Sequence, residues 1–378
     1  MQITNIPVLL LTGYLGSGKT TLLNRILANK AGIRFAVIVN DIGEVNIDAA
    51  LIQQGGVVNQ QDANLLSLAN GCICCTLKMD LVQQLHDLCA SRRFDYIVIE
   101  ASGICEPAPI AQTICSYRQL VPFTEDPVPV LDSIVTVVDA QRLRDEFTDL
   151  EAKFNDRAHV DEDDLASLVI QQIEFCNLIL LNKQSCVSED ELVHVASVVR
   201  AIQPHAEIIP CDYCDVPFDK LLHTRAFNFD KVAGSAAWLE GVEGEVEAEN
   251  EEEGEAYEYG IDTFVYYRRL PMNLGRFDDF VARLWPKNII RCKGMCYFSD
   301  EYDTCYLFEQ AGRQFNLRPC GDFYATMPRE ELLQMMEQDP ILRRDWDEEY
   351  GDRMQKLVFI GQDLDRDAIT AALDNCLD

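Results

Sequence analysis

The sequence predicts an α/β protein, with a doubly wound, mostly parallel sheet domain followed by a smaller α+β domain. Three observations lead to this prediction. Short apolar segments alternate with helical patterns in the first two-thirds, a strongly acidic stretch follows, and apolar periodicity then returns. The 378 residues exceed what one ordinary core accommodates, which favours two domains. A hydrophobic content of 48% with 25% charged residues is typical of a globular protein.

Six short runs rich in Val, Ile and Leu are predicted strands, because such runs are typical of parallel strands buried on both faces. They cover residues 8–12, 35–40, 95–100, 133–139, 178–182 and 207–210. Helical patterns lie between them at 19–29, 79–91, 162–176 and 188–202, and the last begins with Ser188 and Glu191 as a capping box. This alternation predicts a sheet with helices on both faces.

The composition changes near residue 231, where a Gly- and Glu-rich segment begins. Residues 240–258 contain ten glutamates and neither Lys nor Arg, which predicts a flexible linker over 231–260. Beyond it we expect strands at 263–268 and 356–360 and helices at 274–285 and 367–377. The expected organisation is therefore a nucleotide-binding domain at 1–230, a linker at 231–260 and an α+β domain at 261–378.

The charge and the hydropathy exclude several classes of protein. A formal net charge of -31 argues against binding a nucleic-acid backbone or an anionic membrane, both of which require basic patches. No apolar stretch approaches the roughly 18 residues that cross a bilayer, and residues 1–7 do not resemble a secretory signal. We therefore expect a cytoplasmic protein, whose fifteen cysteines are reduced thiols.

A phosphate-binding loop follows the first predicted strand and opens the first predicted helix. The pattern G-x-x-x-x-G-K-[ST] requires this context, because backbone N–H groups of the loop and the helix N-terminus bind phosphate. Lys19 is expected to reach the β- and γ-phosphates and Thr20 to ligate Mg²⁺. The predicted nucleotide-binding residues are Gly13, Tyr14, Leu15, Gly16, Ser17, Gly18, Lys19, Thr20 and Thr21.

Glu100 ends the predicted strand 95–100 and provides a carboxylate where P-loop proteins hold Mg²⁺ or orient water. We predict that it acts with Lys19 and Thr20 in catalysis and with Thr20 in binding Mg²⁺. A buried strand with an acidic end is the structural alternative for Glu100 taken alone.

Asn182 and Lys183 follow the strand 178–182 in the manner of the Asn-Lys-x-Asp stretch that reads guanine. Ser185 stands where the aspartate of that stretch is expected. A hydroxyl cannot accept two hydrogen bonds from guanine as a carboxylate does. The sequence therefore weakens the expected preference for GTP over ATP.

Three thiols, Cys72, Cys74 and Cys75, follow the turn signal Asn70-Gly71. Three thiolates suit a tetrahedral Zn²⁺ ion and leave a fourth position open, as a carrier requires. The cluster lies in the part of the chain where P-loop GTPases reorder on loss of the γ-phosphate. A buried core position or a redox role are the alternatives. Weaker candidates are Cys211 with Cys214, and Cys292, Cys296, Cys305 and Cys320.

Together these motifs resemble the CobW-like metallochaperone GTPases. The matching segments are the loop 13–20, Asn40 to Val45, Gly71 to Cys75, Glu100 to Gly103, Glu106 to Pro109, Asn182-Lys183, Arg291 to Gly294 and 357–361. The resemblance implies that the first domain is a GTPase and that Cys72, Cys74 and Cys75 bind metal, commonly zinc. It also implies that the second domain helps to recognise a client. Ser185 and the absence of a His-rich linker depart from the family pattern.

The functional hypothesis is a GTP-hydrolysing metallochaperone that uses GTP, Mg²⁺ and Zn²⁺ and delivers metal to a client metalloprotein. Three alternatives remain: a P-loop small-molecule kinase with structural cysteines, a metal buffer without turnover, and a cobalt or iron insertase of the same family. The sequence names neither the client nor the oligomeric state.

Overall fold

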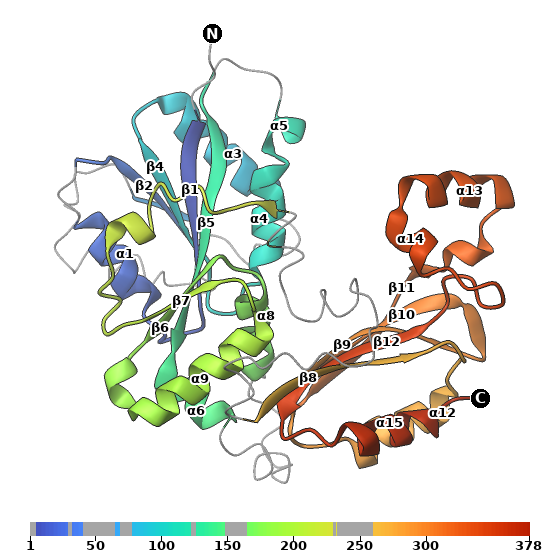
Figure 1. Cartoon of the computed structure of the whole chain (residues 1–378). Coiled ribbons are helices and arrows are strands. Elements are labelled where there is room, and N and C mark those ends of the chain that lie inside the picture. Colours follow the sequence, from blue (N-terminus) through green and yellow to red (C-terminus); the bar gives the residue numbers. More distant parts are fainter. Residues whose placement is uncertain are drawn as a thin grey trace. The chain divides into compact units, whose positions relative to one another are not determined.

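The computed structural model of the chain describes residues 5–28, 32–40, 65–68, 78–121, 126–147, 165–229, 232 and 260–378. The described residues form two compact units, each built on its own sheet (Figure 1). The linker predicted at 231–260 lies outside the described residues, apart from Val232 and Gly260.

The first sheet has seven strands, all parallel, in the order β3-β2-β4-β1-β5-β6-β7. The strands are β1 (Asn5–Thr12), β2 (Phe35–Asn40), β3 (Leu65–Leu68), β4 (Tyr96–Glu100), β5 (Val128–Asp139), β6 (Leu178–Asn182) and β7 (Glu207–Pro210). Every residue of β4 and β6 is buried, as expected of parallel strands covered on both faces. The six predicted strands are present, and β3 is an additional one.

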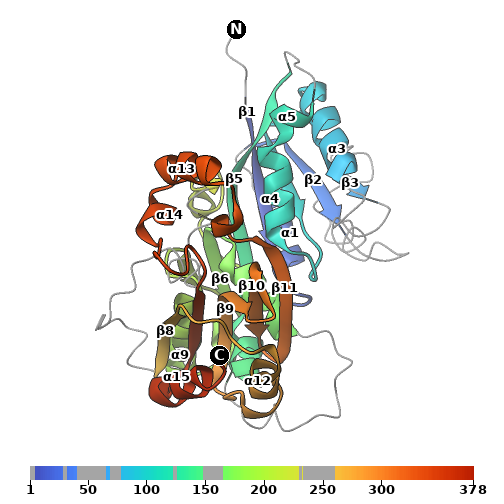
Figure 2. The ribbon, with the colours of Figure 1, turned by 90° about the vertical axis from the view of Figure 1, so that its right-hand side faces the viewer.

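Helices cover both faces of this sheet, which confirms the predicted doubly wound architecture. They are α1 (Lys19–Leu27), α3 (Lys78–Ser91), α4 (Pro107–Cys115), α5 (Tyr117–Leu120), α6 (Ala140–Phe147), α8 (Leu165–Glu174) and α9 (Glu189–Ile202). Leu22, Leu23 and Ile26 of α1 are fully buried in the core on one face, and α3 and α4 lie on the opposite side of the sheet (Figures 1 and 2). The capping box of α9 is present: Ser188 N–H donates to Glu191 Oε2 at 2.8 Å, and Glu191 N–H to Ser188 Oγ at 3.3 Å.

The second sheet is antiparallel, in the order β11-β10-β9-β12-β8. Its strands are β8 (Ile261–Arg268), β9 (Ile289–Phe298), β10 (Glu301–Ala311), β11 (Gln314–Asp322) and β12 (Gln355–Gln362). The helices are α12 (Leu274–Asp279), α13 (Arg329–Gln338), α14 (Pro340–Arg344) and α15 (Arg366–Asp374). Phe277 of α12 and Ile369 and Leu373 of α15 pack in one aromatic-rich core with β9 and β12. This unit is the predicted α+β domain.

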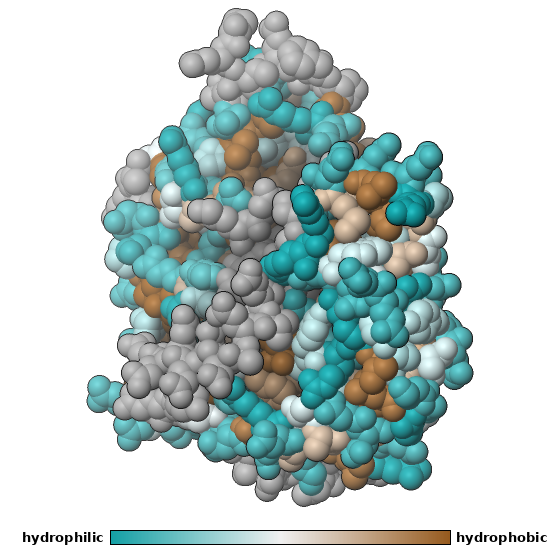
Figure 3. All heavy atoms as spheres, turned by 45° about the vertical axis from the view of Figure 1, so that its right-hand side comes forward, coloured by the Kyte–Doolittle hydropathy of each residue, from teal (hydrophilic) through white to brown (hydrophobic). Residues whose placement is uncertain are grey.

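The predicted helix 274–285 is α12 followed by a π-helical turn, Phe280–Leu284, which ends before Pro286. Strands β9, β10 and β11 were not predicted. Among the described residues, no helix combines the length and the apolar character needed to cross a membrane. Hydrophilic residues dominate the described surface seen in Figure 3, where apolar residues form small separate groups.

Candidate nucleotide site

The predicted nucleotide residues meet at one edge of the parallel sheet, where all seven strands have their carboxyl ends. The strand register pairs Leu11 of β1 with Glu100 of β4, and Asp139 of β5 with Asn182 of β6. The structure therefore brings the loop after β1 close to Glu100 and Asn182. This edge is where ligands bind in open α/β sheets.

The loop between β1 and α1 depends on glycine at two positions. Gly13 and Gly18 have φ angles of 135° and 121°, which L-residues rarely adopt. A Cβ atom on Gly13 would lie 2.4 Å from the Val137 carbonyl oxygen, and one on Gly18 would lie 2.5 Å from Asn182 Nδ2. The first turn of α1 contains no acidic residue. The helix N-terminus, with its positive end of the dipole, is therefore available to an anion.

Lys19 and Thr20 are the first two residues of α1. The Lys19 side chain bonds the loop, and the Thr20 side chain bonds the end of β4. Lys19 is 7% exposed and donates through Nζ to the carbonyl oxygens of Gly13 at 2.7 Å and Tyr14 at 3.2 Å. Thr20 Oγ1 donates to Glu100 Oε1 at 3.2 Å, and Glu100 is 1% exposed. A hydroxyl and a carboxylate oxygen are the hard ligands that Mg²⁺ prefers.

Two buried hydroxyls, one in the loop and one beside it, support the fit to a polyanion. Ser17 Oγ and Ser102 Oγ are buried, and neither has a hydrogen-bond partner among the described residues. A Cβ atom on Gly103, which follows Ser102, would lie 2.7 Å from the Leu15 backbone nitrogen, so this turn lies directly against the loop. Buried polar atoms without partners are rare in native proteins. A bound phosphate group, or a water molecule bound to it, would provide hydrogen-bond partners here.

Tyr14 attaches the loop to the end of β5. Its hydroxyl donates to the Asp139 carbonyl oxygen at 3.2 Å and accepts from the Asp139 N–H at 3.1 Å. The ring is 1% exposed, and the Arg142 guanidinium lies 5.6 Å from its centroid. Two hydrogen bonds and a cation–π contact thus attach the loop to the end of β5 and the start of α6.

Asn182 and Lys183 connect the loop to neighbouring segments. Asn182 Nδ2 donates to the Ser17 carbonyl oxygen at 2.8 Å, and its Oδ1 accepts from the Cys214 N–H at 3.0 Å. Lys183 has a left-handed φ of 61°, and its Nζ forms an ion pair with Asp139 Oδ2 at 2.5 Å. Asp139 was not among the predicted site residues, and Cys214 was only a weaker metal or redox candidate. Asp139 ends the predicted strand 133–139 as Glu100 ends the predicted strand 95–100, and this position was the signal that could have identified it.

Ser185 contacts an acidic residue that the sequence did not single out. Its backbone N–H and its hydroxyl both donate to Asp212 Oδ1, at 3.1 and 2.8 Å. Asp212 follows β7, the neighbour of β6 in the sheet. A carboxylate therefore lies beside the position where the guanine-reading aspartate is missing.

The proposed zinc ligands Cys72, Cys74 and Cys75 lie outside the described residues, as do Asp41 to Val45.

Cys211 and Cys214 are 3% and 1% exposed, and Cys214 Sγ lies 3.5 Å from the Gly18 carbonyl oxygen, behind the loop. The hydrogen bond between the two thiols lowers the pKa of Cys211 and raises that of Cys214. In the second unit, burial raises the pKa of Cys292 and Cys296, while Cys305 and Cys320 lie with their sulfur atoms 3.2 Å apart. Within the described ranges, no group of three or more His, Cys, Asp or Glu side chains could hold a metal ion.

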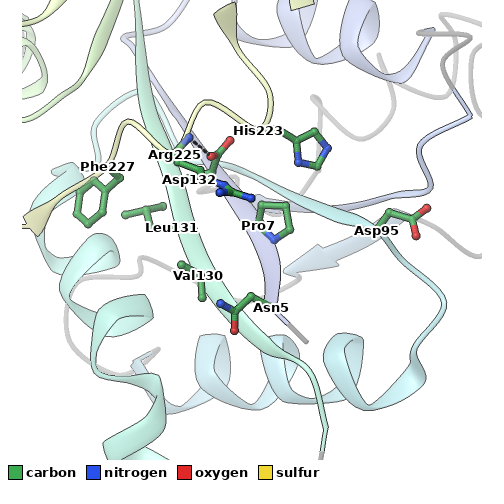
Figure 4. A pocket seen from close by; sticks show the side chains of 9 residues that line it. All are labelled: Asn5, Pro7, Asp95, Val130, Leu131, Asp132, His223, Arg225 and Phe227. Atoms are coloured by element: carbon green, nitrogen blue, oxygen red, sulfur yellow. Dashed lines mark hydrogen bonds between the residues drawn. The ribbon is translucent and has the colours of Figure 1, made fainter. Parts of the chain in front are cut away.

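A separate pocket lies at the opposite edge of the first sheet, near the start of β1 (Figure 4). Its walls include the buried Asp132, whose carboxylate accepts from the Tyr96 hydroxyl at 2.5 Å and from the Thr224 and Arg225 N–H groups at 3.1 and 2.6 Å. Burial, together with the bond to Asp132, raises the pKa of Tyr96. These contacts attach the segment after β7 to the sheet, and none of the predicted site residues lines this pocket.

A parallel sheet with this loop, this acidic strand end and Asn182 at the next strand end defines a P-loop nucleotide-binding protein. Residues 7–210 match the family model described as CobW/HypB/UreG, nucleotide-binding domain, and residues 261–377 match the cobalamin synthesis protein cobW C-terminal domain. The chain therefore belongs to the CobW/HypB/UreG family of P-loop GTPases, with the CobW C-terminal domain following the nucleotide-binding domain.

Several curated relatives extend over most of this chain. The zinc-regulated GTPase metalloprotein activator 1 of Dictyostelium discoideum is 35% identical over 390 residues, which cover 98% of this chain and 80% of the relative. The zinc chaperone YjiA of Escherichia coli is 27% identical over 379 residues, with 97% of each chain covered. The zinc chaperone CobW of Pseudomonas aeruginosa is 31% identical over 240 residues, covering 59% of this chain and 61% of the relative.

Proposed function

We propose that this protein is a GTP-hydrolysing metallochaperone that binds Zn²⁺ through Cys72, Cys74 and Cys75 and transfers it to a client metalloprotein. The names of the relatives, which are zinc chaperones and a zinc-regulated GTPase, support the choice of nucleotide and metal. The single observation that carries the proposal is the arrangement of Lys19, Thr20 and Glu100 at one sheet edge. This arrangement is what hydrolysis of a nucleoside triphosphate requires.

In the proposed reaction, backbone N–H groups of the loop and the start of α1 bind the β- and γ-phosphates. Lys19 exchanges the carbonyl oxygens of Gly13 and Tyr14 for phosphate oxygens and stabilises the charge that develops as water attacks the γ-phosphate. Mg²⁺, when bound, supplies further neutralisation of phosphate charge, with Thr20 and Glu100 as its protein ligands. The products are GDP and phosphate.

The topology supports a connection between the phosphates and the thiols. Strand β3 is parallel to β2, so its carboxyl end at Leu68 lies at the same edge as the loop 13–20, and Cys72 follows four residues later. Three inter-strand steps separate β3 from β1 in the sheet order, or ~15 Å at the usual strand spacing. Cys74 and Cys75 follow Leu68 by six and seven residues, and seven extended residues span up to ~25 Å, so the chain is long enough to bring these thiols to the phosphates.

We further propose that the segments 41–64 and 69–77, on either side of β3, carry the coupling. Contacts to the γ-phosphate favour one arrangement of these segments, and their loss on hydrolysis changes the thiolate geometry and weakens metal binding. Coupling between two ligands is reciprocal, so bound Zn²⁺ changes the affinity for nucleotide by the same factor as nucleotide changes the affinity for Zn²⁺.

The test uses protein purified without a tag and measures its zinc content, its hydrolysis of GTP and ATP, and zinc transfer to a colorimetric chelator. The triple variant Cys72→Ser, Cys74→Ser, Cys75→Ser is expected to lose zinc and nucleotide-dependent transfer while it still hydrolyses GTP. The matched control replaces Cys115, Cys186 and Cys320, which are three exposed cysteines, with serine. Retention of zinc by the triple variant would contradict the assignment of the ligands.

The same experiment separates the alternatives. A small-molecule kinase would transfer phosphate to an acceptor other than water and would be indifferent to the three thiols. A metal buffer would bind zinc without turnover. Loading with Co²⁺ and Fe²⁺ in parallel compares zinc with the other metals of this family, because thiolate ligands alone do not choose among them.

A further inference from the structure

Ser185 stands where the base-recognising aspartate of the Asn-Lys-x-Asp stretch is expected. A different acid, Asp212, lies next to Ser185. We propose that Asp212 is the guanine-specificity residue of this chain and that its carboxylate, held by Ser185, replaces the aspartate of the Asn-Lys-x-Asp stretch. The inference rests on the proposed use of GTP and deepens it.

The hydrogen bonds around Asp212 leave one carboxylate oxygen for a ligand. The Ser185 hydroxyl and N–H both donate to Oδ1, at 2.8 and 3.1 Å. No described residue donates to Oδ2. Lys183 and Arg25 are paired with other acids: Lys183 with Asp139 at 2.5 Å and Arg25 with Asp215 at 2.6 Å. Asp212 is half-buried, so a base can approach it from the solvent side.

The backbone around Asp212 is fixed relative to the Asn182-Lys183 stretch. The Cys211 N–H donates to the Leu181 carbonyl oxygen at 2.9 Å, and the Gln184 N–H donates to the Cys211 carbonyl oxygen at 3.2 Å. These bonds lie on either side of the Asn182–Cys214 bond described above, so the segments 181–185 and 211–214 form one unit. A carboxylate positioned in this way before the ligand arrives loses little entropy on binding.

Both residues that directly follow Asp212 adopt a backbone conformation that costs energy. Tyr213 and Cys214 have φ angles of 51° and 54°, in the left-handed region. Non-glycine residues keep such angles where the surrounding contacts enforce them, and they concentrate at binding sites. The conformation turns the chain so that Cys214 N–H bonds Asn182 while the Asp212 side chain faces Ser185.

The chemistry of the purine edge explains what a carboxylate contributes. Guanine presents two donors side by side, N1–H and the N2 amino group, and the two lone pairs of the remaining Asp212 oxygen, Oδ2, can accept from both. Adenine presents the lone pair of N1 at the same place, which a carboxylate repels. A site that depends on such hydrogen bonds discriminates strongly against a base that lacks the donors. Ser185 then acts as the clamp of the acid and not as the reader of the base.

The experiment measures the affinities of GDP, ADP and the xanthine nucleotide XDP by calorimetry, for the full chain and for Asp212→Asn. Xanthine carries an oxygen in place of the N2 amino group, so an amide, which donates and accepts, matches it where a carboxylate does not. We expect the wild type to prefer GDP over ADP, and Asp212→Asn to bind GDP about 10- to 100-fold more weakly and XDP at least about tenfold more tightly. Asp215→Asn, in the same loop, is the matched control and is expected to keep the preference for GDP.

A gain of affinity for XDP separates base reading from mere damage to the loop. The double variant Ser185→Asp, Asp212→Asn moves the carboxylate to the usual position and is expected to regain the preference for GDP. Unchanged GDP binding in Asp212→Asn, or an equal loss for all three nucleotides, would overturn the assignment. A xanthine switch without any zinc dependence of nucleotide binding would contradict the metallochaperone proposal and leave the role of Asp212 intact.

Discussion

Thr20 in the first turn of α1 donates its hydroxyl to the Glu100 carboxylate at the end of β4, across 3.2 Å and 80 residues of sequence. The register of β1 and β4, which pairs Leu11 with Glu100, produces this contact. Because Glu100 is almost fully buried, its carboxylate would be costly to keep there without a hydrogen bond or a cation. Under the proposed function, Thr20 and Glu100 together would hold Mg²⁺.

Replacement of this carboxylate tests the assignment. Glu100→Gln keeps the shape of the side chain and removes its charge. We expect kcat for GTP hydrolysis to fall about 100-fold or more and the Mg²⁺ concentration for half-maximal activity to rise. Turnover measured over a Mg²⁺ titration checks this, with the exposed Glu106→Gln as control. An unchanged Mg²⁺ dependence would reduce Glu100 to a structural role.

Gly18→Ala is expected to abolish nucleotide binding. The new Cβ would lie 2.5 Å from Asn182 Nδ2 at a φ of 121°, so the loop would have to move away from Asn182. Gly32→Ala is the matched control, since Gly32 also has a positive φ, 77°, but an added Cβ would meet no atom of the described residues within 4 Å. Its left-handed angle alone costs about 1–2 kcal/mol of stability. GDP binding measured by calorimetry and urea unfolding of both variants distinguish the effect of the contact with Asn182 from the effect of backbone strain. GDP binding by Gly18→Ala would refute the prediction.

Asp132→Ala is expected to destabilise the first domain without changing the chemistry. Its carboxylate satisfies three donors, from Tyr96, Thr224 and Arg225, and Asp132 is 2% exposed. Leaving these donors without an acceptor costs about 3 kcal/mol or more in the free energy of unfolding. Urea unfolding measures the loss, and kcat per folded molecule is expected to stay within about twofold because Asp132 lies at the other edge of the sheet. A large loss of kcat with unchanged stability would show that the pocket in Figure 4 takes part in turnover.

The ion pair of Arg34 and Asp95 makes stability depend on acid. Hydrogen bonds from the Arg34 guanidinium and N–H lower the pKa of Asp95 from 3.8 to about 2. Because the folded-state pKa is the lower one, the unfolded chain binds more protons between these values. The contribution is therefore present above about pH 4 and is lost as the pH falls towards 2. It is small, since 43% of the Asp95 side chain is exposed.

Arg34→Gln is expected to flatten the decline of unfolding free energy between pH 4 and pH 2 that this pair causes. Urea unfolding at several pH values compares the variant with the wild type. A parallel decline in both proteins would show that the ion pair does not contribute in solution.

The sequence was sufficient to predict the parallel sheet and the loop, because buried parallel strands such as 178–182 are uninterrupted apolar runs and the loop pattern is local. It was insufficient for β11, whose residues are mostly exposed and include Pro319 and Gly321, as edge strands tolerate. The hairpin of β10 and β11 did carry a signal: Gly312, with a φ of 56°, opens a two-residue turn between Ala311 and Gln314.

The partners within the site were harder to predict than its motifs. Lys183 meets Asp139, and Ser185 meets Asp212, only because β5, β6 and β7 are neighbours in the sheet. Strand order follows from tertiary packing and not from local sequence. The prediction that Ser185 weakens the preference for guanine considered one residue of the stretch and could not take account of a carboxylate delivered by the next strand.

Under the proposed function, the nucleotide site and the three thiols are thermodynamically coupled. The most direct test of this coupling is the dissociation constant of Zn²⁺ measured with a non-hydrolysable GTP analogue and with GDP, for the wild type and for the variant Cys72→Ser, Cys74→Ser, Cys75→Ser. We expect a difference of about fivefold or more between the two nucleotide states in the wild type, matched by the same factor in nucleotide affinity with and without Zn²⁺. Identical zinc affinities in both nucleotide states would contradict the coupling.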